Sequence, residues 1–197
     1  MKKSSLDLVN LENYNIKSIN YYFVKHKQYN ITLEELNNIW INDNICKVNK
    51  NIAQILKKIN EELQNYWLEL LVKDGYRSQE LYNLVYHKRI ALEGKEYVDK
   101  IFKPIRAIHS TGNVVDVSII NSITWEEIPM RDDYDELGKK KDSDTIIKSF
   151  YTNAFKDSTY NKEQWFHTNR MLLKKVMNEH WFDWINNEYR HFEYIWN

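Results

Sequence analysis

Cysteine is nearly absent from the 197-residue chain, which contains only Cys46. A single cysteine excludes an intramolecular disulfide and a zinc cluster held by several thiolates. A nucleophilic role would need a histidine and an orienting group beside the thiol, and the neighbouring sequence offers neither. We therefore interpret Cys46 as a small buried apolar residue.

The chain also lacks an excess of charge and a long hydrophobic run. Its 28 Lys and Arg residues balance its 28 Asp and Glu residues, so the formal net charge is zero. This balance does not favour a nucleic acid or an anionic membrane as a partner, because both attract basic proteins. Lys2 and Lys3 resemble the start of a secretion signal, but Asp7 and Asn10 interrupt the segment that follows. With no run long enough to cross a bilayer, we expect a cytoplasmic protein.

Glycine and proline are scarce, with 4 and 2 residues respectively, so the sequence contains no obvious interdomain linker. The length fits one domain, and the aromatic share of 14% provides large side chains for its core. We expect a single domain over residues 1–197. In it, a helical N-terminal part, about 1–70, packs on a catalytic core, about 71–197.

Apolar spacing predicts the secondary structure. A capping box at Thr32 and Glu35 marks one helix start, and Ser78 is a candidate cap for another. Helices are predicted over 32–40, 52–70, 78–90, 146–154 and 162–179. Strands are predicted over 70–72, 114–120, 123–130 and at two places within 182–196. This irregular order predicts an α+β fold with a central antiparallel sheet flanked by helices.

Two short polar clusters, far apart in the sequence, carry the residue types of a metal site. The first runs from His109 to Asp116, and the second from Glu188 to His191. Gly112 permits a turn that brings the His109 imidazole back beside the Asp116 carboxylate. Neutral histidine nitrogens and carboxylate oxygens suit Zn²⁺. The sequence therefore predicts that His109, Asp116 and His191 hold one zinc ion.

Two further side chains could complete a hydrolytic site. Zinc lowers the pKa of a bound water towards neutrality. Glu188 is placed to take a proton from that water and to pass it to a leaving amine. Arg77, which ends the segment 74–77 after a predicted strand, is a candidate to stabilise the oxyanion that forms on the attacked carbonyl.

Taken together, these segments resemble the zinc D-alanyl-D-alanine dipeptidases of the type found in vancomycin resistance (VanX-type), which are related to the D-Ala-D-Ala carboxypeptidases. The shared motifs are Asp-Gly-Tyr-Arg at 74–77, His-x6-Asp at 109–116, Pro-Met followed by Asp at 129–135, and Glu-x2-His at 188–191. The resemblance covers roughly residues 15–195. It implies a zinc D-Ala-D-Ala peptidase architecture (hedgehog/DD-peptidase-like).

The resemblance also implies one zinc ion per chain and a small peptide such as D-Ala-D-Ala as the substrate. By this resemblance the metal ligands are His109, Asp116 and His191, the general base and acid is Glu188, the oxyanion ligand is Arg77, and the substrate contacts are Asp135 and Tyr21. The contact from Asp135 would be to the free ammonium of the dipeptide, which is a charge-assisted interaction.

The chain departs from the family at two places near the expected site. The family's serine two residues before the first histidine is Ala107, which removes a hydroxyl. The aromatic pair between the final glutamate and histidine is Tyr189 and Arg190. An added cation at that place could favour a carboxylate or a longer acidic peptide.

Three alternatives remain open. A D,D-carboxypeptidase-like enzyme would act on longer peptidoglycan stem peptides. Asp135 discriminates between this enzyme and a dipeptidase, because a carboxylate that binds the substrate ammonium selects a peptide with a free N-terminus. A two-His-one-carboxylate iron oxygenase would use the same ligand types, although it has no use for Glu188 as a base. A metal-stabilised binding module without turnover would need neither Glu188 nor Arg77.

Overall fold

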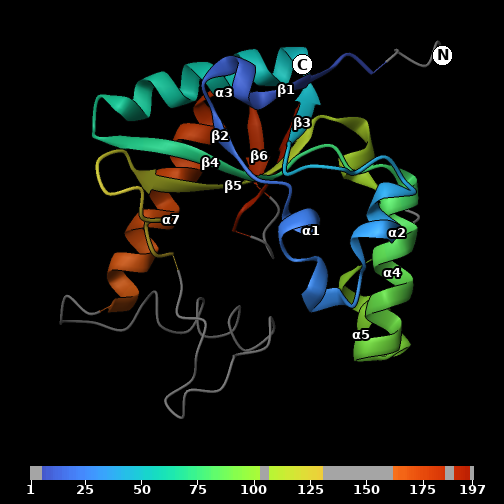
Figure 1. Cartoon of the computed structure of the whole chain (residues 1–197). Coiled ribbons are helices and arrows are strands. Elements are labelled where there is room, and N and C mark those ends of the chain that lie inside the picture. The colour runs from blue at the N-terminus through green and yellow to red at the C-terminus, as the bar shows by residue number, and fades with distance from the viewer. Residues whose placement is uncertain (1–5, 103–106, 131–161, 185–188, 196–197) are drawn as a thin grey trace.

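The computed structural model of the chain describes residues 6–102, 107–130, 162–184 and 189–195 (Figure 1). Its strands are β1 (Leu8–Asn10), β2 (Lys17–Ser18), β3 (Lys47–Asn49), β4 (Leu68–Asp74), β5 (Val114–Asn121), β6 (Phe182–Trp184) and β7 (His191–Tyr194). Its α-helices are α1 (Tyr21–Val24), α2 (Leu33–Asn37), α3 (Lys50–Gln64), α4 (Gln79–Glu93), α5 (Lys95–Ile101) and α7 (Lys162–Glu179). Short 3-10 helices are η1 (Leu11–Tyr14), η2 (His26–Tyr29) and η4 (Ile108–Thr111). None of the described helices is both long and apolar enough to cross a membrane.

A five-stranded sheet with the order β2-β4-β5-β7-β6 forms the centre of the fold. The pairing of β2 with β4 is parallel, and the other three pairings are antiparallel. β1 and β3 form a separate antiparallel pair. This arrangement confirms the predicted α+β class with a largely antiparallel central sheet. The proposed division into a part of about 1–70 and a core of about 71–197 stays a prediction.

One face of the sheet is covered by α3 and α7. Side chains two residues apart on a strand share a face, so Val115 and Val117 point to the same side. Both belong to the main hydrophobic core together with Leu56 of α3, Leu173 of α7 and Phe192 of β7. Asp116, which lies between the two valines, therefore points to the opposite face. The apolar packing on one side leaves the other side for polar chemistry.

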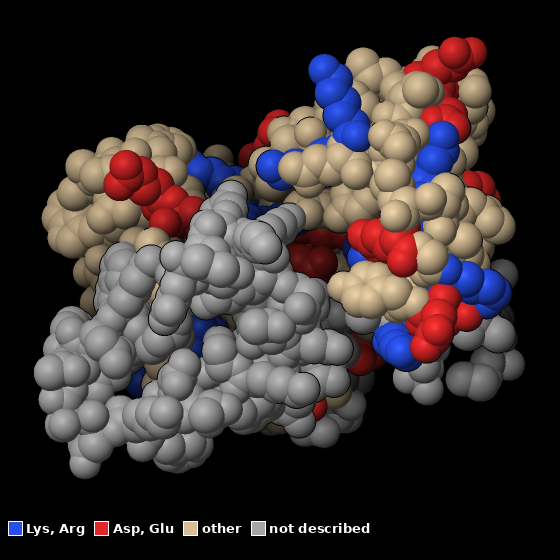
Figure 2. Space-filling view, turned by 90° about the horizontal axis from the view of Figure 1, so that it is seen from below, with Lys and Arg blue, Asp and Glu red and all other residues tan. Residues whose placement is uncertain are grey.

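A second, smaller core lies at one end of the sheet, where α1, α2, α4 and α5 gather (Figure 1). Its buried members are Tyr22, Ile31, Leu36, Leu81, Tyr82, Val85, Val98 and Phe102. In the view from below, acidic atoms lie deep in a recess near the middle of the molecule, beside this helical group (Figure 2). These acidic atoms are therefore visible from outside through the recess.

Most of the predicted elements that the structure describes are present. The capping box at Thr32 and Glu35 is formed, and the Ser78 hydroxyl accepts a hydrogen bond from the backbone of Leu81. Two short strands, β6 and β7, occupy the aromatic C-terminal segment as expected. Cys46 is buried in the main core, where burial raises the pKa of its thiol, so its interpretation as an apolar core residue is confirmed.

Other boundaries were wrong. The helix predicted over 52–70 ends at Gln64, because the chain turns through a left-handed conformation at Trp67 (φ 58°) and enters β4. The strand predicted over 123–130 is reduced to one bridge, between Ile120 and Glu127. The helix predicted over 146–154 lies outside the described residues.

Candidate metal centre

Strand register places the predicted ligands side by side. Asp116 on β5 pairs with Asp74 of β4 on one side and with His191 of β7 on the other. His109 lies on η4, just before β5, and Asp116 lies within that strand. Gly112 ends η4 in the left-handed conformation (φ 71°), which glycine adopts without steric cost, so the chain can turn from His109 into β5.

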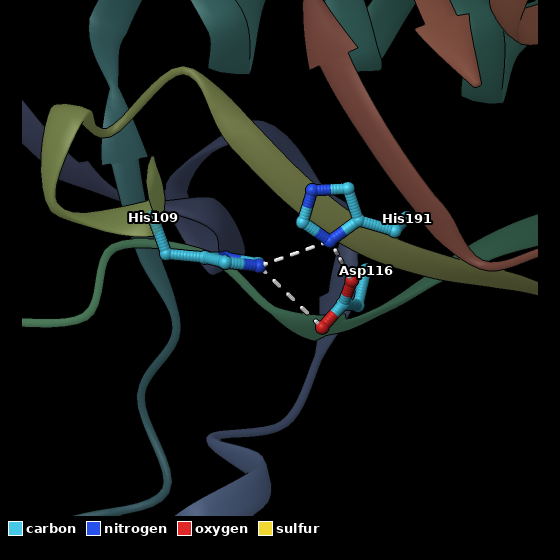
Figure 3. A group of neighbouring side chains, drawn as sticks. All are labelled: His109, Asp116 and His191. Carbon is cyan, nitrogen blue, oxygen red and sulfur yellow. Dashed lines mark hydrogen bonds and ion pairs between the residues drawn. The ribbon is translucent and has the colours of Figure 1, made fainter. Parts of the chain in front are cut away.

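The three side chains converge on one point (Figure 3). His109 Nε2 lies 3.3 Å from His191 Nδ1 and 3.7 Å from Asp116 Oδ2, and His191 Nδ1 lies 3.1 Å from Asp116 Oδ1. Bonds of about 2.0–2.1 Å around a tetrahedral zinc ion would place neighbouring donors about 3.3 Å apart. The observed separations match that spacing, so the three donors fit a zinc ion.

The orientation of His109 is set by a backbone carbonyl. Its Nδ1 lies 2.8 Å from the carbonyl oxygen of Gly75, directly after β4. A carbonyl can only accept, so Nδ1 carries the proton and donates it there, which leaves Nε2 with its lone pair facing Asp116 and His191. Such a contact fixes the tautomer that a metal-binding imidazole needs.

The protonation states also suit a metal. Burial lowers the pKa of His109, which favours the neutral imidazole, although the nearby Asp116 charge opposes this shift. For Asp116, burial would raise the pKa, but His109 and His191 outweigh it and bring the pKa to about 2. Near neutral pH the site therefore offers an ionised carboxylate and a neutral His109 imidazole, which are the forms that bind metal.

Asn49, at the end of β3, holds the turn between His109 and Asp116. Its Nδ2 donates to the carbonyl of Thr111 at 2.8 Å and to Asn113 Oδ1 at 2.7 Å. Its backbone N–H donates to the carbonyl of Gly112 at 3.0 Å. Sequence reasoning missed this residue, because nothing local connects β3 with a turn more than sixty positions later.

Arg77 is buried beside the three ligands. Its backbone N–H donates to the carbonyl of His109, and its guanidinium forms an ion pair with Asp74. The rings of Tyr22 and Tyr82 lie 4.7 and 4.5 Å from the guanidinium carbon. Its Nε is buried and has no hydrogen-bond partner in the described part of the chain. The side chain is therefore held firmly and retains a donor for a further anion.

The structure describes only one of the three remaining predicted site residues, Tyr21. Tyr21 begins α1, and its ring packs edge-on against Tyr22 with the centroids 5.4 Å apart. It is Tyr22, and not Tyr21, whose ring packs on Arg77. The role of Tyr21 in a substrate pocket stays a prediction. Asp135 and Glu188 lie outside the described residues, so their roles also stay predictions.

A second polar cluster, of which only Arg190 was singled out from the sequence, lies on the Asp116 face of the sheet. The carboxylate of Glu127 accepts from Lys73 at 2.5 Å, from the Ser118 hydroxyl at 2.7 Å and from Arg190 at 2.8 Å. Ser118 shares a face of β5 with Asp116, because the two residues are two positions apart. Arg190 directly precedes His191. We call Lys73, Ser118, Glu127 and Arg190 the Glu127 cluster.

No protein-family model matches this chain, and no curated protein matches its sequence. Among solved structures, the LdcB LD-carboxypeptidase is similar, with 19% identity and a TM-score of 0.45, covering 98% of this chain and 70% of its own. The vancomycin-resistance D,D-pentapeptidase VanY with Zn(II) is similar at 15% identity and a TM-score of 0.32, over 76% of this chain and 73% of its own. VanYB in complex with D-alanine-D-alanine is similar at 13% identity and a TM-score of 0.34, over 76% of this chain and 72% of its own. All three TM-scores are below 0.5.

Proposed function

We propose that this protein is a zinc-dependent peptidase that hydrolyses D-Ala-D-Ala or a closely related small peptide. The observation that carries the proposal is the convergence of His109, Asp116 and His191, whose donor atoms all lie within 4.8 Å of one another. Two imidazoles and one carboxylate leave an open position on a four-coordinate zinc ion, which is the arrangement of catalytic rather than structural sites.

The chemistry follows from these groups. Zinc held by the three ligands supplies Lewis acidity and a water of lowered pKa. Glu188, three residues before His191 in the sequence, is proposed to take a proton from the attacking water and to return it to the departing amine. Arg77 is proposed to stabilise the oxyanion on the attacked carbonyl, because its guanidinium is rigid and has a donor to spare.

The metal content is the first test. Purified protein should contain about one zinc per chain by elemental analysis, and Asp116→Ala should lose it, since only two of the three ligands remain. Bound iron together with the absence of peptide cleavage would instead favour the two-His-one-carboxylate oxygenase.

Turnover is the second test. Alanine release from D-Ala-D-Ala should be lost in Glu188→Gln while zinc is retained, because Glu188 is proposed as a proton carrier and not as a ligand. Equal turnover by this variant would remove the proposed mechanism. A zinc-loaded protein that releases alanine neither from D-Ala-D-Ala nor from a longer stem peptide would be a binding module instead.

Peptide length separates the dipeptidase from the carboxypeptidase alternative. We expect D-Ala-D-Ala to be cut and a pentapeptide stem to be cut poorly, with Asp135→Ala impairing the dipeptide because it removes the proposed clamp on the free ammonium. If Asp135→Ala leaves dipeptide cleavage unchanged while the longer stem is cut well, the enzyme is a carboxypeptidase. The similar structures are named as an LD-carboxypeptidase and a D,D-pentapeptidase, and these names fit the carboxypeptidase alternative.

A further inference from the structure

The Glu127 cluster places two cations beside the metal centre. Lys73 and Arg190 both form ion pairs with the carboxylate of Glu127. All three charged side chains are partly accessible, with 14% of Lys73, 28% of Arg190 and 31% of Glu127 exposed. A molecule bound at this face of the sheet can therefore reach them.

The cluster is within reach of a bound peptide. Ser118 lies two residues along β5 from Asp116, which is about 7 Å on an antiparallel strand. Arg190 and Ser118 both donate to the same oxygen of Glu127, so the guanidinium lies over the face of β5 that carries Asp116. A peptide bond placed at the three metal ligands would therefore bring the side chain of a neighbouring substrate residue near Arg190.

Arg190 has unused hydrogen-bonding capacity. Its Nη2 donates to Glu127, whereas its Nε is buried and lacks a hydrogen-bond partner in the described part of the chain. A guanidinium presents five donors in a planar fork that matches a carboxylate. The side chain can therefore hold Glu127 and a second carboxylate at the same time.

We propose that Arg190, supported by Lys73, forms a subsite that recognises a carboxylate on the substrate side chain next to the scissile bond. The preferred substrate is then an acidic peptide. This inference rests on the proposed peptidase function and narrows it to a substrate class. Glu127 is the internal counter-ion that orients both cations and competes with the substrate carboxylate.

The test compares acidic peptides with their neutral isosteres. The zinc-loaded protein is given D-Ala-D-Glu against D-Ala-D-Gln, and D-Glu-D-Ala against D-Gln-D-Ala, which places the carboxylate on either side of the cleaved bond. We expect kcat/KM for one acidic peptide to exceed that of its amide by about tenfold or more, since hydrogen bonds between charged groups are the strong ones. Equal values within both pairs would overturn the inference.

Two variants separate recognition from structure. Arg190→Gln and Glu127→Gln break the same ion pair but change the charge of the cluster in opposite directions. Arg190→Gln removes a cation, whereas Glu127→Gln removes the carboxylate and keeps both cations. If the cluster only holds the chain together, both variants change the acid-to-amide ratio in the same way or not at all. If it recognises a carboxylate, Arg190→Gln abolishes the preference for the acidic peptide and Glu127→Gln increases it, because the competing carboxylate is gone.

A matched control removes a cation elsewhere. Lys57→Gln breaks an exposed ion pair with Glu61 on α3 and should leave the acid-to-amide ratio unchanged. Cleavage of the neutral peptides without an acidic preference would overturn the subsite alone. No cleavage of any of the four peptides or of D-Ala-D-Ala would overturn both the subsite and the proposed hydrolysis of dipeptides.

Discussion

His109 Nδ1 and the carbonyl oxygen of Gly75 lie 2.8 Å apart, so the orientation of one predicted ligand depends on the backbone that follows β4. Gly75 itself has no room for a side chain. A Cβ there would lie 2.6 Å from the carbonyl oxygen of Lys47 and 2.8 Å from Cys46 Sγ. The packing of β3 against this backbone thus sets the position of the carbonyl that fixes the imidazole.

Gly75→Ala should therefore weaken metal binding. The added methyl group forces the backbone away from β3 and moves the carbonyl that orients His109. We expect the zinc Kd to rise about tenfold, as is typical when a partner of a metal-binding histidine is lost. The free energy of unfolding should fall by about 1–3 kcal/mol from overpacking. Competition with a chromogenic chelator and urea titration measure the two effects.

The control for this prediction is Val85→Ala, which opens a cavity in the second core. It should cost a similar stability, about 1–3 kcal/mol, without changing the zinc Kd. An unchanged Kd in Gly75→Ala would show that the carbonyl does not govern the ligand. A raised Kd in Val85→Ala would show that any loss of stability weakens the site.

Asn49 is expected to act through the same metal centre. Asn49→Asp keeps the size of the side chain but removes the amide donors to Thr111 and Asn113, and it places a carboxylate opposite a carbonyl oxygen. We expect a rise in the zinc Kd of severalfold and a stability loss of about 1–2 kcal/mol. Both are measured as for Gly75→Ala. A variant with normal zinc affinity would show that the turn between His109 and Asp116 holds its shape unaided.

Prediction from sequence succeeded where the signal was local or chemical. The capping box of α2 needs only Thr32 and Glu35, four positions within one turn, and it is formed. The convergence of His109, Asp116 and His191 was predicted from their residue types and from the motifs shared with the D-Ala-D-Ala peptidases, and the three donors do lie together. The pairing of β5 with β7 brings Asp116 and His191 side by side, and the turn at Gly112 adds His109.

Prediction failed where long-range packing decides. Trp67 and Leu70 continue the helical spacing of α3, but Trp67 is two-thirds exposed and in a left-handed turn, while Leu70 is buried on β4. Apolar residues spaced three and four positions apart do not show at which residue the backbone leaves a helix. The contacts of Gly75 and Asn49 likewise depend on how β3 packs against the backbone after β4 and against the turn before β5. Those of Glu127 depend on its bridge to β5, and sequence spacing contains none of this information.

Glu127 should make the stability of the protein depend on pH. Burial raises the pKa of Glu127, but the charges of Arg190 and Lys73 and the Ser118 hydroxyl outweigh it and lower the pKa below its usual value. Near the ordinary pKa of about 4.5, the folded state then binds fewer protons than the unfolded state, so stability rises with pH. The stabilisation is complete above that range and is lost as the pH falls through the lower, folded pKa.

Urea unfolding of the parent protein and of Glu127→Gln, between about pH 3 and pH 7, measures this effect. The parent should be the more stable of the two near neutral pH, and the difference should shrink on acidification, because the glutamine cannot titrate. A difference that stays constant with pH would show that the cluster does not stabilise the ionised carboxylate.

Arg77 and Asp74 form a buried ion pair in which a stabilising role and a catalytic role can be separated. Arg77→Met leaves the Asp74 carboxylate buried without its partner and should cost about 3–5 kcal/mol in unfolding free energy. Adding Asp74→Asn removes the second charge, so the double variant should recover much of that stability. If Arg77 stabilises the oxyanion, the double variant stays inactive towards D-Ala-D-Ala although it folds and binds zinc. Recovery of turnover together with stability would show that Arg77 only positions the chain around His109.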